Sequence, residues 1–180
     1  AFSVNPFHEF PQDQRADGAI VFADIDNDLN LDLLITTRQP STGLGYIYAF
    51  KQDSTPVNDL WNGNFANSFS VPISNGDKIT MPKIAVGNLD HDTANSLEIV
   101  FGSRNYLYAL DKNGVSVPNF PIAIVDAYST PLLADVDDDD DSEIIINNKG
   151  AINAYNYDGS ACSGFPIVAE KIWPFVSSPA

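Results

Sequence analysis

The sequence predicts an all-β fold made of repeated four-stranded units, and two observations support this prediction. Residues 142–167 align with residues 97–122 at a constant offset of 45 residues and without gaps, so that Glu143 matches Glu98 and Gly159 matches Gly114. Short runs rich in Val, Ile, Leu and aromatic residues recur between Gly, Pro, Asn and Asp, and no long stretch has helical apolar spacing. A tandem repeat of this length is typical of a β-propeller blade of four antiparallel strands.

The strands are expected in the same order in each unit. In the last unit they are TPLLADV (130–136), EIIINN (143–148), AINAY (151–155) and CSGFPI (162–167). In the first unit they are AIVFA (19–23), DLLITT (32–37), YIYAF (46–50) and SFSVPI (68–73). The middle unit begins with KIAVG (83–87). The first strand of each unit is apolar and contains small residues, which suits a strand next to a crowded propeller axis.

The repeats divide the chain into three blades, at 13–75 with a long insertion, at 76–123 and at 124–168. Residues 1–12 are expected to be the tail of a preceding blade, and residues 169–180 the start of a following one. Propellers typically use about 4 to 8 blades, and a single blade needs neighbours to cover its faces. We therefore expect a larger propeller, with the remaining blades supplied by the parent chain or by a second copy.

The charge of the chain limits its partners. The 180 residues include 24 acidic and 9 basic ones, for a formal net charge of -15. Such a surface repels nucleic acid and anionic membranes, so neither is expected as a partner, whereas cations are. No apolar run reaches the roughly 18 residues of a membrane-spanning helix, so membrane insertion is not expected.

Acidic residues recur at one place in each unit, between the first and second strands. DIDNDLNLD places Asp24, Asp26, Asp28 and Asp32 at loop positions 1, 3, 5 and 9, and DVDDDDDSE places Asp135, Asp137, Asp139 and Glu143 at the same positions. In NLDHDTANSLE, Asn88, Asp90 and Asp92 take positions 1, 3 and 5, and Glu98 follows two residues late. Alternate oxygen-bearing side chains in a tight loop converge on one point, as the 6 to 8 oxygen ligands of Ca²⁺ require. The spacing predicts two or three calcium ions.

An EF-hand is excluded as the source of this pattern. An EF-hand loop needs Gly at position 6 and flanking helices, whereas this chain has Leu29 and Asp140 at that position and expected strands on either side. The single cysteine, Cys162, has no second Cys for a disulfide and no His or Cys neighbourhood in the sequence. It is interpreted as a small strand residue and not as a metal ligand.

The acidic loop, the following Ile/Val strand, Phe101-Gly102 and the closing FPI resemble the FG-GAP or VCBS repeats of integrin-alpha-type β-propellers over essentially the whole chain. The resemblance implies calcium in the loop between the first two strands of a blade, usually on extracellular proteins. The ligands that it implies are Asp24, Asp26, Asp28, Asn30 (carbonyl) and Asp32; Asn88, Asp90, Asp92 and Glu98; and Asp135, Asp137, Asp139, Asp141 (carbonyl) and Glu143.

The chain departs from that family at two loop positions. The family often has glycine at positions 4 and 6, where this chain has Asn27, Leu29, Asp138 and Asp140. Asn and Asp adopt left-handed backbone conformations with modest strain, so Leu29 is the largest departure.

Function is predicted from the calcium loops and the insertion. Extracellular modules bind calcium with Kd values of about 10⁻⁴ to 10⁻³ M, so we expect a secreted or cell-surface protein. The first hypothesis is a non-catalytic binding or adhesion module for carbohydrate or an extracellular protein. Within the insertion, Trp61, Asn62, Asn64 and Phe65 combine aromatic rings with amides, as sugar or peptide sites do; the alternative is that Trp61 packs the long loop onto its blade.

Two other functions are kept as alternatives. The chain could be the propeller part of a secreted polysaccharide lyase or hydrolase, or a structural spacer of a surface protein. The enzyme hypothesis is disfavoured because the chain has two histidines, His8 and His91, and no GxSxG motif.

Overall fold

A computed structural model describes residues 13, 15–16, 18–41, 44–53, 55, 69–70, 83–90, 97–127 and 129–168. Within these ranges the chain forms twelve β-strands and no helix, which confirms the predicted all-β class. No helix in this part of the chain is therefore long and apolar enough to cross a bilayer.

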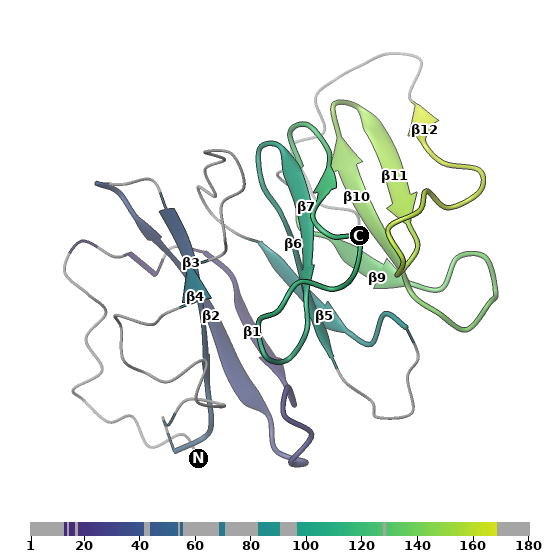
Figure 1. Ribbon diagram of the computed structural model, residues 1–180. Helices are drawn as coiled ribbons and strands as arrows, with labels where there is room; N and C mark the ends of the chain where they lie inside the picture. The colour runs from purple at the N-terminus through teal and green to yellow at the C-terminus, as the bar shows by residue number, and fades with distance from the viewer. Residues whose placement is uncertain are drawn as a thin grey trace.

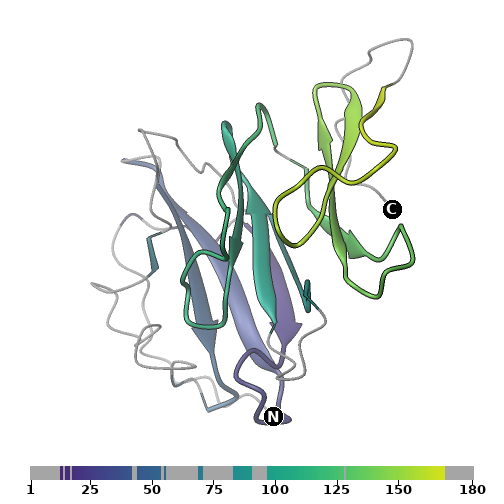
Figure 2. The same cartoon turned by 45° about the vertical axis from the view of Figure 1, so that its right-hand side comes forward.

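The strands form three antiparallel sheets of four strands each. The first sheet contains β1 (Ile20–Ala23), β2 (Asp32–Gln39), β3 (Leu44–Phe50) and β4 (Phe69–Ser70). The second contains β5 (Ile84–Gly87), β6 (Glu98–Gly102), β7 (Tyr106–Leu110) and β8 (Ile122–Ala123), and the third β9 (Leu132–Ala134), β10 (Glu143–Asn148), β11 (Ala151–Tyr155) and β12 (Ile167–Val168). In each sheet, strands that follow one another in the chain are neighbours, and the three sheets lie side by side (Figures 1 and 2).

The second and third strands of the third sheet have the bounds that the sequence predicts, whereas β2 ends two residues later and β3 begins two residues earlier than predicted. The first and fourth strands are shorter than predicted. The bounds of β10 and β11 equal those of EIIINN and AINAY. In contrast, β12 has two residues, 167 and 168, instead of the predicted run from Cys162 to Ile167. Pro166 immediately precedes this strand and has no N–H to donate to the neighbouring strand. Pro121 precedes β8 in the same way, and the fourth strands are therefore brief.

Two hydrophobic clusters join the three sheets. One packs Leu34 of the first sheet with Ile99 and Phe101 of the second. The other packs Val100, which points to the opposite face of β6, with Ile144 of the third sheet. Every residue of β6 is buried, so the second sheet is covered on both faces. This burial explains why Ile99, Val100 and Phe101 of β6 form an apolar run without alternation.

The first strands lie close together, because β5 contacts both β1 and β9. Glycines permit close approach between neighbouring units. A Cβ on Gly87 would lie 2.9 Å from Leu133 Cδ1, and a Cβ on Gly102 would lie 2.0 Å from the carbonyl oxygen of Ala127. The second sheet therefore meets Leu133 of the third sheet, and the segment that precedes this sheet, at positions where a side chain would collide.

The outermost sheets leave apolar side chains exposed. Ile20 and Phe22 of β1 and Ile167 and Val168 of β12 are all exposed. No sheet closes on itself, and the described part of the chain does not close into a ring.

Candidate metal centre

The first and third acidic loops have a left-handed backbone at the same two positions. Positions 4 and 6 have positive φ in both: 61° at Asn27 and 68° at Leu29, and 68° at Asp138 and 72° at Asp140. The FG-GAP and VCBS repeats, which these loops resemble, often have glycine at both positions. Asn and Asp tolerate this conformation because their short polar side chains can hydrogen-bond locally, whereas Leu29 has no such group and is 90% exposed.

Backbone amides of each loop donate to its own carboxylates. At position 6, Leu29 N–H donates to Asp24 Oδ2 at 2.9 Å, and Asp140 N–H donates to Asp135 Oδ2 at 3.2 Å. The amide of position 7 donates to the carboxylate of position 5 in each loop, from Asn30 to Asp28 Oδ1 at 2.9 Å and from Asp141 to Asp139 Oδ1 at 3.0 Å. These bonds orient the carboxylates of positions 1 and 5 relative to the loop backbone.

The last acid of each loop accepts a hydrogen bond from the amide of position 2 in all three units. The pairs are Ile25 N–H to Asp32 Oδ2 at 3.0 Å, Leu89 N–H to Glu98 Oε2 at 2.9 Å and Val136 N–H to Glu143 Oε2 at 2.8 Å. All three acids are buried. Glu98 therefore takes the same place as Asp32 and Glu143, although its sequence spacing is two residues longer.

Burial makes ionisation of two of these closing acids, Asp32 and Glu143, less favourable than in water. Burial raises the pKa of Asp32 to about 6, and the negative charges of Asp26 and Asp28 act in the same direction. Burial also raises the pKa of Glu143, with a further contribution from Asp137. A bound divalent ion would reverse this effect, because it favours the charged form of every nearby carboxylate.

Buried oxygens without a hydrogen-bond partner indicate that the acidic-loop residues fit a hard cation. Asp26 Oδ1, at position 3 of the first loop, and Asn88 Oδ1, at position 1 of the second, are buried without a hydrogen-bond partner. Carboxylate oxygens lie within 4.8 Å of one another in two groups, Asp24, Asp26 and Asp32 in the first loop and Asp135, Asp137 and Asp139 in the third. Buried oxygens that lack a donor and converge on one point are the ligands that Ca²⁺ takes.

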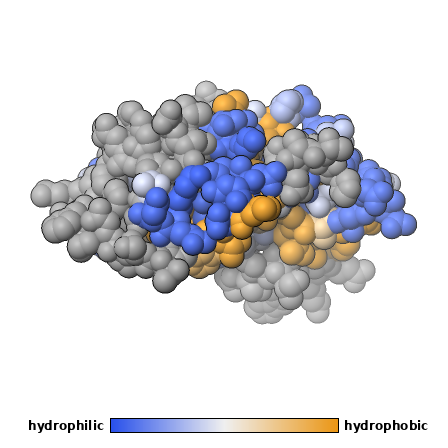
Figure 3. All heavy atoms as spheres, turned by 90° about the horizontal axis from the view of Figure 1, so that it is seen from below, coloured by the Kyte–Doolittle hydropathy of each residue, from blue (hydrophilic) through white to orange (hydrophobic). Residues whose placement is uncertain are grey.

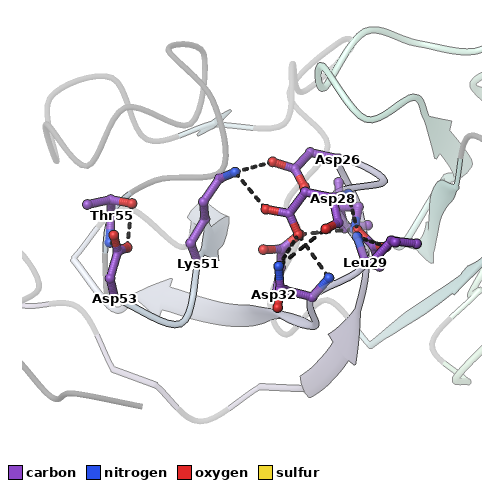
Figure 4. Close-up of polar contacts among 10 residues, drawn as sticks. Asp26, Asp28, Leu29, Asp32, Lys51, Asp53 and Thr55 are labelled. Atoms are coloured by element: carbon purple, nitrogen blue, oxygen red, sulfur yellow. Dashed lines mark hydrogen bonds and ion pairs between the residues drawn. The ribbon is translucent and has the colours of Figure 1, made fainter. Parts of the chain in front are cut away.

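A lysine that the sequence analysis missed lies against the first loop. Lys51 Nζ pairs with Asp26 Oδ2 and lies 3.1 Å from Asp28 Oδ2 (Figure 4). Hydrogen bonds to these two carboxylates raise the pKa of Lys51. Hydrogen bonds from Asn30 and Lys51 lower the pKa of Asp28. Lys51 directly follows β3, so only the pairing of β3 with β2 brings it to the loop.

The third loop has a different neighbour, Cys162. Its Sγ lies 3.8 Å from Asp137 Oδ2 and forms a group with the carboxylates of Asp137 and Glu143 in which ligand atoms are within 4.8 Å of one another. Cys162 is buried but lies outside the described strands, although the sequence predicted a small strand residue, and its neighbours in this group are carboxylates and not His or Cys. The bridge between Tyr155 and Ala161 places Cys162 beside the loop, and burial raises the pKa of the thiol.

The second loop is described only in part. Asn88, Asp90 and Glu98 are described, whereas Asp92 and His91 lie outside the described residues. Beside this loop is a cavity of about 240 Å³ whose lining includes Asp90, Glu98, Asp111, Asn113, Ser116 and Tyr157. The predicted ligand-binding residues Trp61, Asn62, Asn64 and Phe65 also lie outside the described residues.

The end of the molecule that carries the first loop has a mixed surface. Seen from below, the described residues form a broad hydrophilic area with hydrophobic residues beside it (Figure 3). The exposed apolar residues of the loops are Leu29 and Leu31 in the first and Val136 in the third. Acidic and apolar side chains are therefore presented together at the loops.

No protein-family model and no curated protein matches the chain. Among solved structures, the crystal structure of the V. cholerae biofilm matrix protein Bap1 is similar over 84% of this chain and 31% of that chain, with a TM-score of 0.49 and 17% sequence identity. The chain thus spans about a third of the length of that protein. A likeness of this degree supports no conclusion about function, and the resemblance to FG-GAP or VCBS repeats stays a prediction from the loop motif.

Proposed function

We propose that the chain is a calcium-stabilised, extracellular β-propeller module with a non-catalytic binding or adhesion role. The observation that carries this proposal is the common geometry of the first and third loops. Both have positive φ at positions 4 and 6, a first carboxylate that accepts the amide of position 6, and a buried closing acid that accepts the amide of position 2. Calcium bound there would neutralise carboxylates that otherwise repel one another at short range.

The propeller arrangement is supported by how the three sheets repeat. Each is a four-stranded meander, and the first strand of the second sheet contacts the first strands of both neighbours. First strands that gather near one line are what a radial arrangement of blades requires. The exposed Ile20 and Phe22 on one outer sheet, and Ile167 and Val168 on the other, would be covered by further blades.

The choice of calcium and of an extracellular compartment follows from the ligand set. Three or four carboxylates per loop with additional carbonyl oxygens suit Ca²⁺, whereas Mg²⁺ keeps several waters and prefers fewer protein ligands. At a calcium concentration about twenty times the Kd, each site adds about 1.8 kcal/mol to the free energy of unfolding. Two sites would contribute a substantial part of the stability of a typical domain, which requires a compartment rich in calcium.

A calcium titration of thermal stability tests the structural role. Two occupied sites are expected to raise the Tm by about 5 to 15 °C between EDTA and millimolar calcium, with a much smaller rise in magnesium. The double variant Asp26→Asn and Asp137→Asn, which changes position 3 of both loops, should lose most of the calcium-dependent rise. Equal Tm values for the wild type in EDTA and in calcium would contradict the proposal.

Ligand binding is proposed at the cavity beside the second loop. Its lining combines the exposed ring of Tyr157 with the polar side chains of Asp111, Asn113 and Ser116, a mixture that suits carbohydrate or a polar peptide. A glycan array and an array of extracellular proteins, each read with and without EGTA, would test this proposal. A calcium-dependent hit that Tyr157→Ala abolishes would support it. A module whose Tm responds to calcium but that binds nothing on either array would instead be a structural spacer.

A further inference from the structure

The three units place different residues at one equivalent position next to the acidic loop. Leu33, Ile99 and Ile144 each follow the closing acid of a loop, and they pair with Phe50, Leu110 and Tyr155 respectively. The next residue along the chain is Lys51 in the first unit, Asp111 in the second and Asn156 in the third. Each begins the same turn, with its amide donating to the carbonyl oxygen four residues later, at 2.7, 2.8 and 2.9 Å.

Only the first unit has a cation at this position. The ammonium of Lys51 reaches across to Asp26 and Asp28, positions 3 and 5 of the loop (Figure 4). In the third unit, the neutral Asn156 is used inside its own turn, where Nδ2 donates to Ser160 Oγ at 2.9 Å. The carboxylates of positions 1, 3 and 5 converge in the third loop, whereas the convergent group of the first consists of positions 1, 3 and 9.

We propose that Lys51 is a built-in counter-cation of the first loop, which supports this loop without calcium and lowers its calcium affinity below that of the third loop. The inference rests on the proposed calcium function. Calcium must share these two carboxylates with Lys51 or displace its ammonium, and the two positive charges repel each other. A group that favours the calcium-free loop must lower the affinity for calcium by the same factor. The two loops are then occupied over different ranges of calcium concentration.

The test uses the full chain with the other loops silenced. In a background carrying Asp90→Asn, Asp135→Asn and Asp137→Asn, calcium binding to the first loop is measured by isothermal titration calorimetry. Lys51→Met, which keeps the apolar stem but removes the charge, is expected to lower the Kd about tenfold. The matched control is Lys149→Met, because Lys149 pairs with Asp126 at 3.9 Å outside the loops and its loss should change the Kd less than twofold.

A reciprocal variant and a stability measurement complete the test. Asn156→Lys, in a background with Asp24→Asn, Asp26→Asn and Asp90→Asn, should weaken calcium binding by the third loop. In EDTA, Lys51→Met should lower the Tm of the otherwise unchanged protein, and it should increase the rise in Tm that calcium produces. Circular dichroism confirms that each variant is folded.

The outcomes separate this inference from the function on which it rests. Binding by the first loop only after Lys51→Met would support the inference in its strongest form. Equal Kd values with and without Lys51 would overturn it and leave calcium binding intact. No heat of binding in the wild type or in any variant would overturn both.

Discussion

Leu29 is the residue whose backbone conformation fits its side chain least well. Its φ is 68°, and the side chain is exposed, so little packing offsets the strain. The left-handed conformation costs an L-residue about 1 to 2 kcal/mol, and glycine avoids this cost. Leu29→Gly is therefore expected to raise the free energy of unfolding by about 0.5 to 1 kcal/mol, measured by urea denaturation.

A matched substitution separates the backbone effect from the loss of an exposed leucine. Leu29→Ala removes the same exposed apolar surface but keeps the Cβ that causes the strain, so it should give little gain. Equal stabilisation by Ala and Gly would show that exposure of the leucine, and not the left-handed backbone, lowers the stability.

Asp32 is expected to make the calcium-free protein sensitive to pH. Its pKa is about 6 in the folded protein against an ordinary value of 3.8. The folded state therefore holds a proton that the unfolded state releases, so the contribution of Asp32 to the free energy of unfolding falls as the pH rises from about 4 to about 6 and then levels off. Urea denaturation in EDTA across this range measures the decrease.

The comparison for this prediction is Asp32→Asn, which cannot ionise. The Asp32 contribution to the decrease should disappear in this variant, so the stability difference between wild type and variant should change between about pH 4 and pH 6. A difference that stays constant over that range would contradict the assignment of the raised pKa to Asp32.

At the scale of the strand, the sequence pattern predicts an element best where its ends are marked by turn residues. EIIINN starts directly after the acidic loop and ends at Lys149-Gly150, and β10 has the same bounds. The fourth strands were predicted too long because the apolar runs include prolines, which cannot donate to a neighbouring strand. Apolar character alone does not show which residues of such a run are paired.

The acidic residues that make up each loop were predicted from their spacing in the sequence. The residues that lie beside each loop in the structure could not be predicted in this way. Carboxylates that alternate within nine residues are close in any tight loop, so sequence spacing is enough to group them. Lys51 and Cys162 approach their loops through strand pairing, from 19 residues beyond Asp32 and from 19 beyond Glu143 respectively. The register between β2 and β3 brings Lys51 to the first loop, and the bridge between Tyr155 and Ala161 brings Cys162 to the third. Neither pairing can be read from the spacing of the loop residues.

Gly102 ends β6 at a point where the backbone of the next unit leaves no room for a side chain. The collision would be with the carbonyl oxygen of Ala127, which cannot rotate away. Gly102→Ala is therefore expected to lower the free energy of unfolding by about 3 kcal/mol, because the second strand or the 124–127 segment must shift. Thermal and urea denaturation measure the loss.

Gly87→Ala provides the comparison for this prediction. Its added Cβ would meet Leu133 Cδ1, the end of a flexible side chain that can change rotamer, so the loss should be clearly smaller. Equal losses for the two variants would contradict the explanation based on backbone contact and would instead indicate a general intolerance of side chains in the first and second strands.

At the scale of the whole molecule, polar contacts join the second and third units in addition to their shared core. The amide of Ser142, next to Glu143 in the third loop, donates to the carbonyl oxygen of Leu89 in the second loop at 3.0 Å. Asn119 Nδ2 donates to the carbonyl oxygen of Asp158 at 2.9 Å. Ordering one loop therefore restricts its neighbour, and calcium bound at one unit should protect more than that unit alone.

This coupling leads to a prediction about how the sheets unfold. Ile144 is fully buried between the second and third sheets, so Ile144→Ala should lower the free energy of unfolding by about 3 kcal/mol. Because Val100 and Phe101 on opposite faces of β6 link the third sheet to the first, the loss should extend to all three. Hydrogen exchange measured by mass spectrometry should then show faster exchange by similar factors in peptides from β2 and β3 and in peptides from β10 and β11.

Ile20→Ala, at an exposed position of β1, is the control and should change the exchange rate of neither pair of strands. Faster exchange confined to β10 and β11 would show that the third sheet unfolds independently, as in a repeat array whose interfaces are weak.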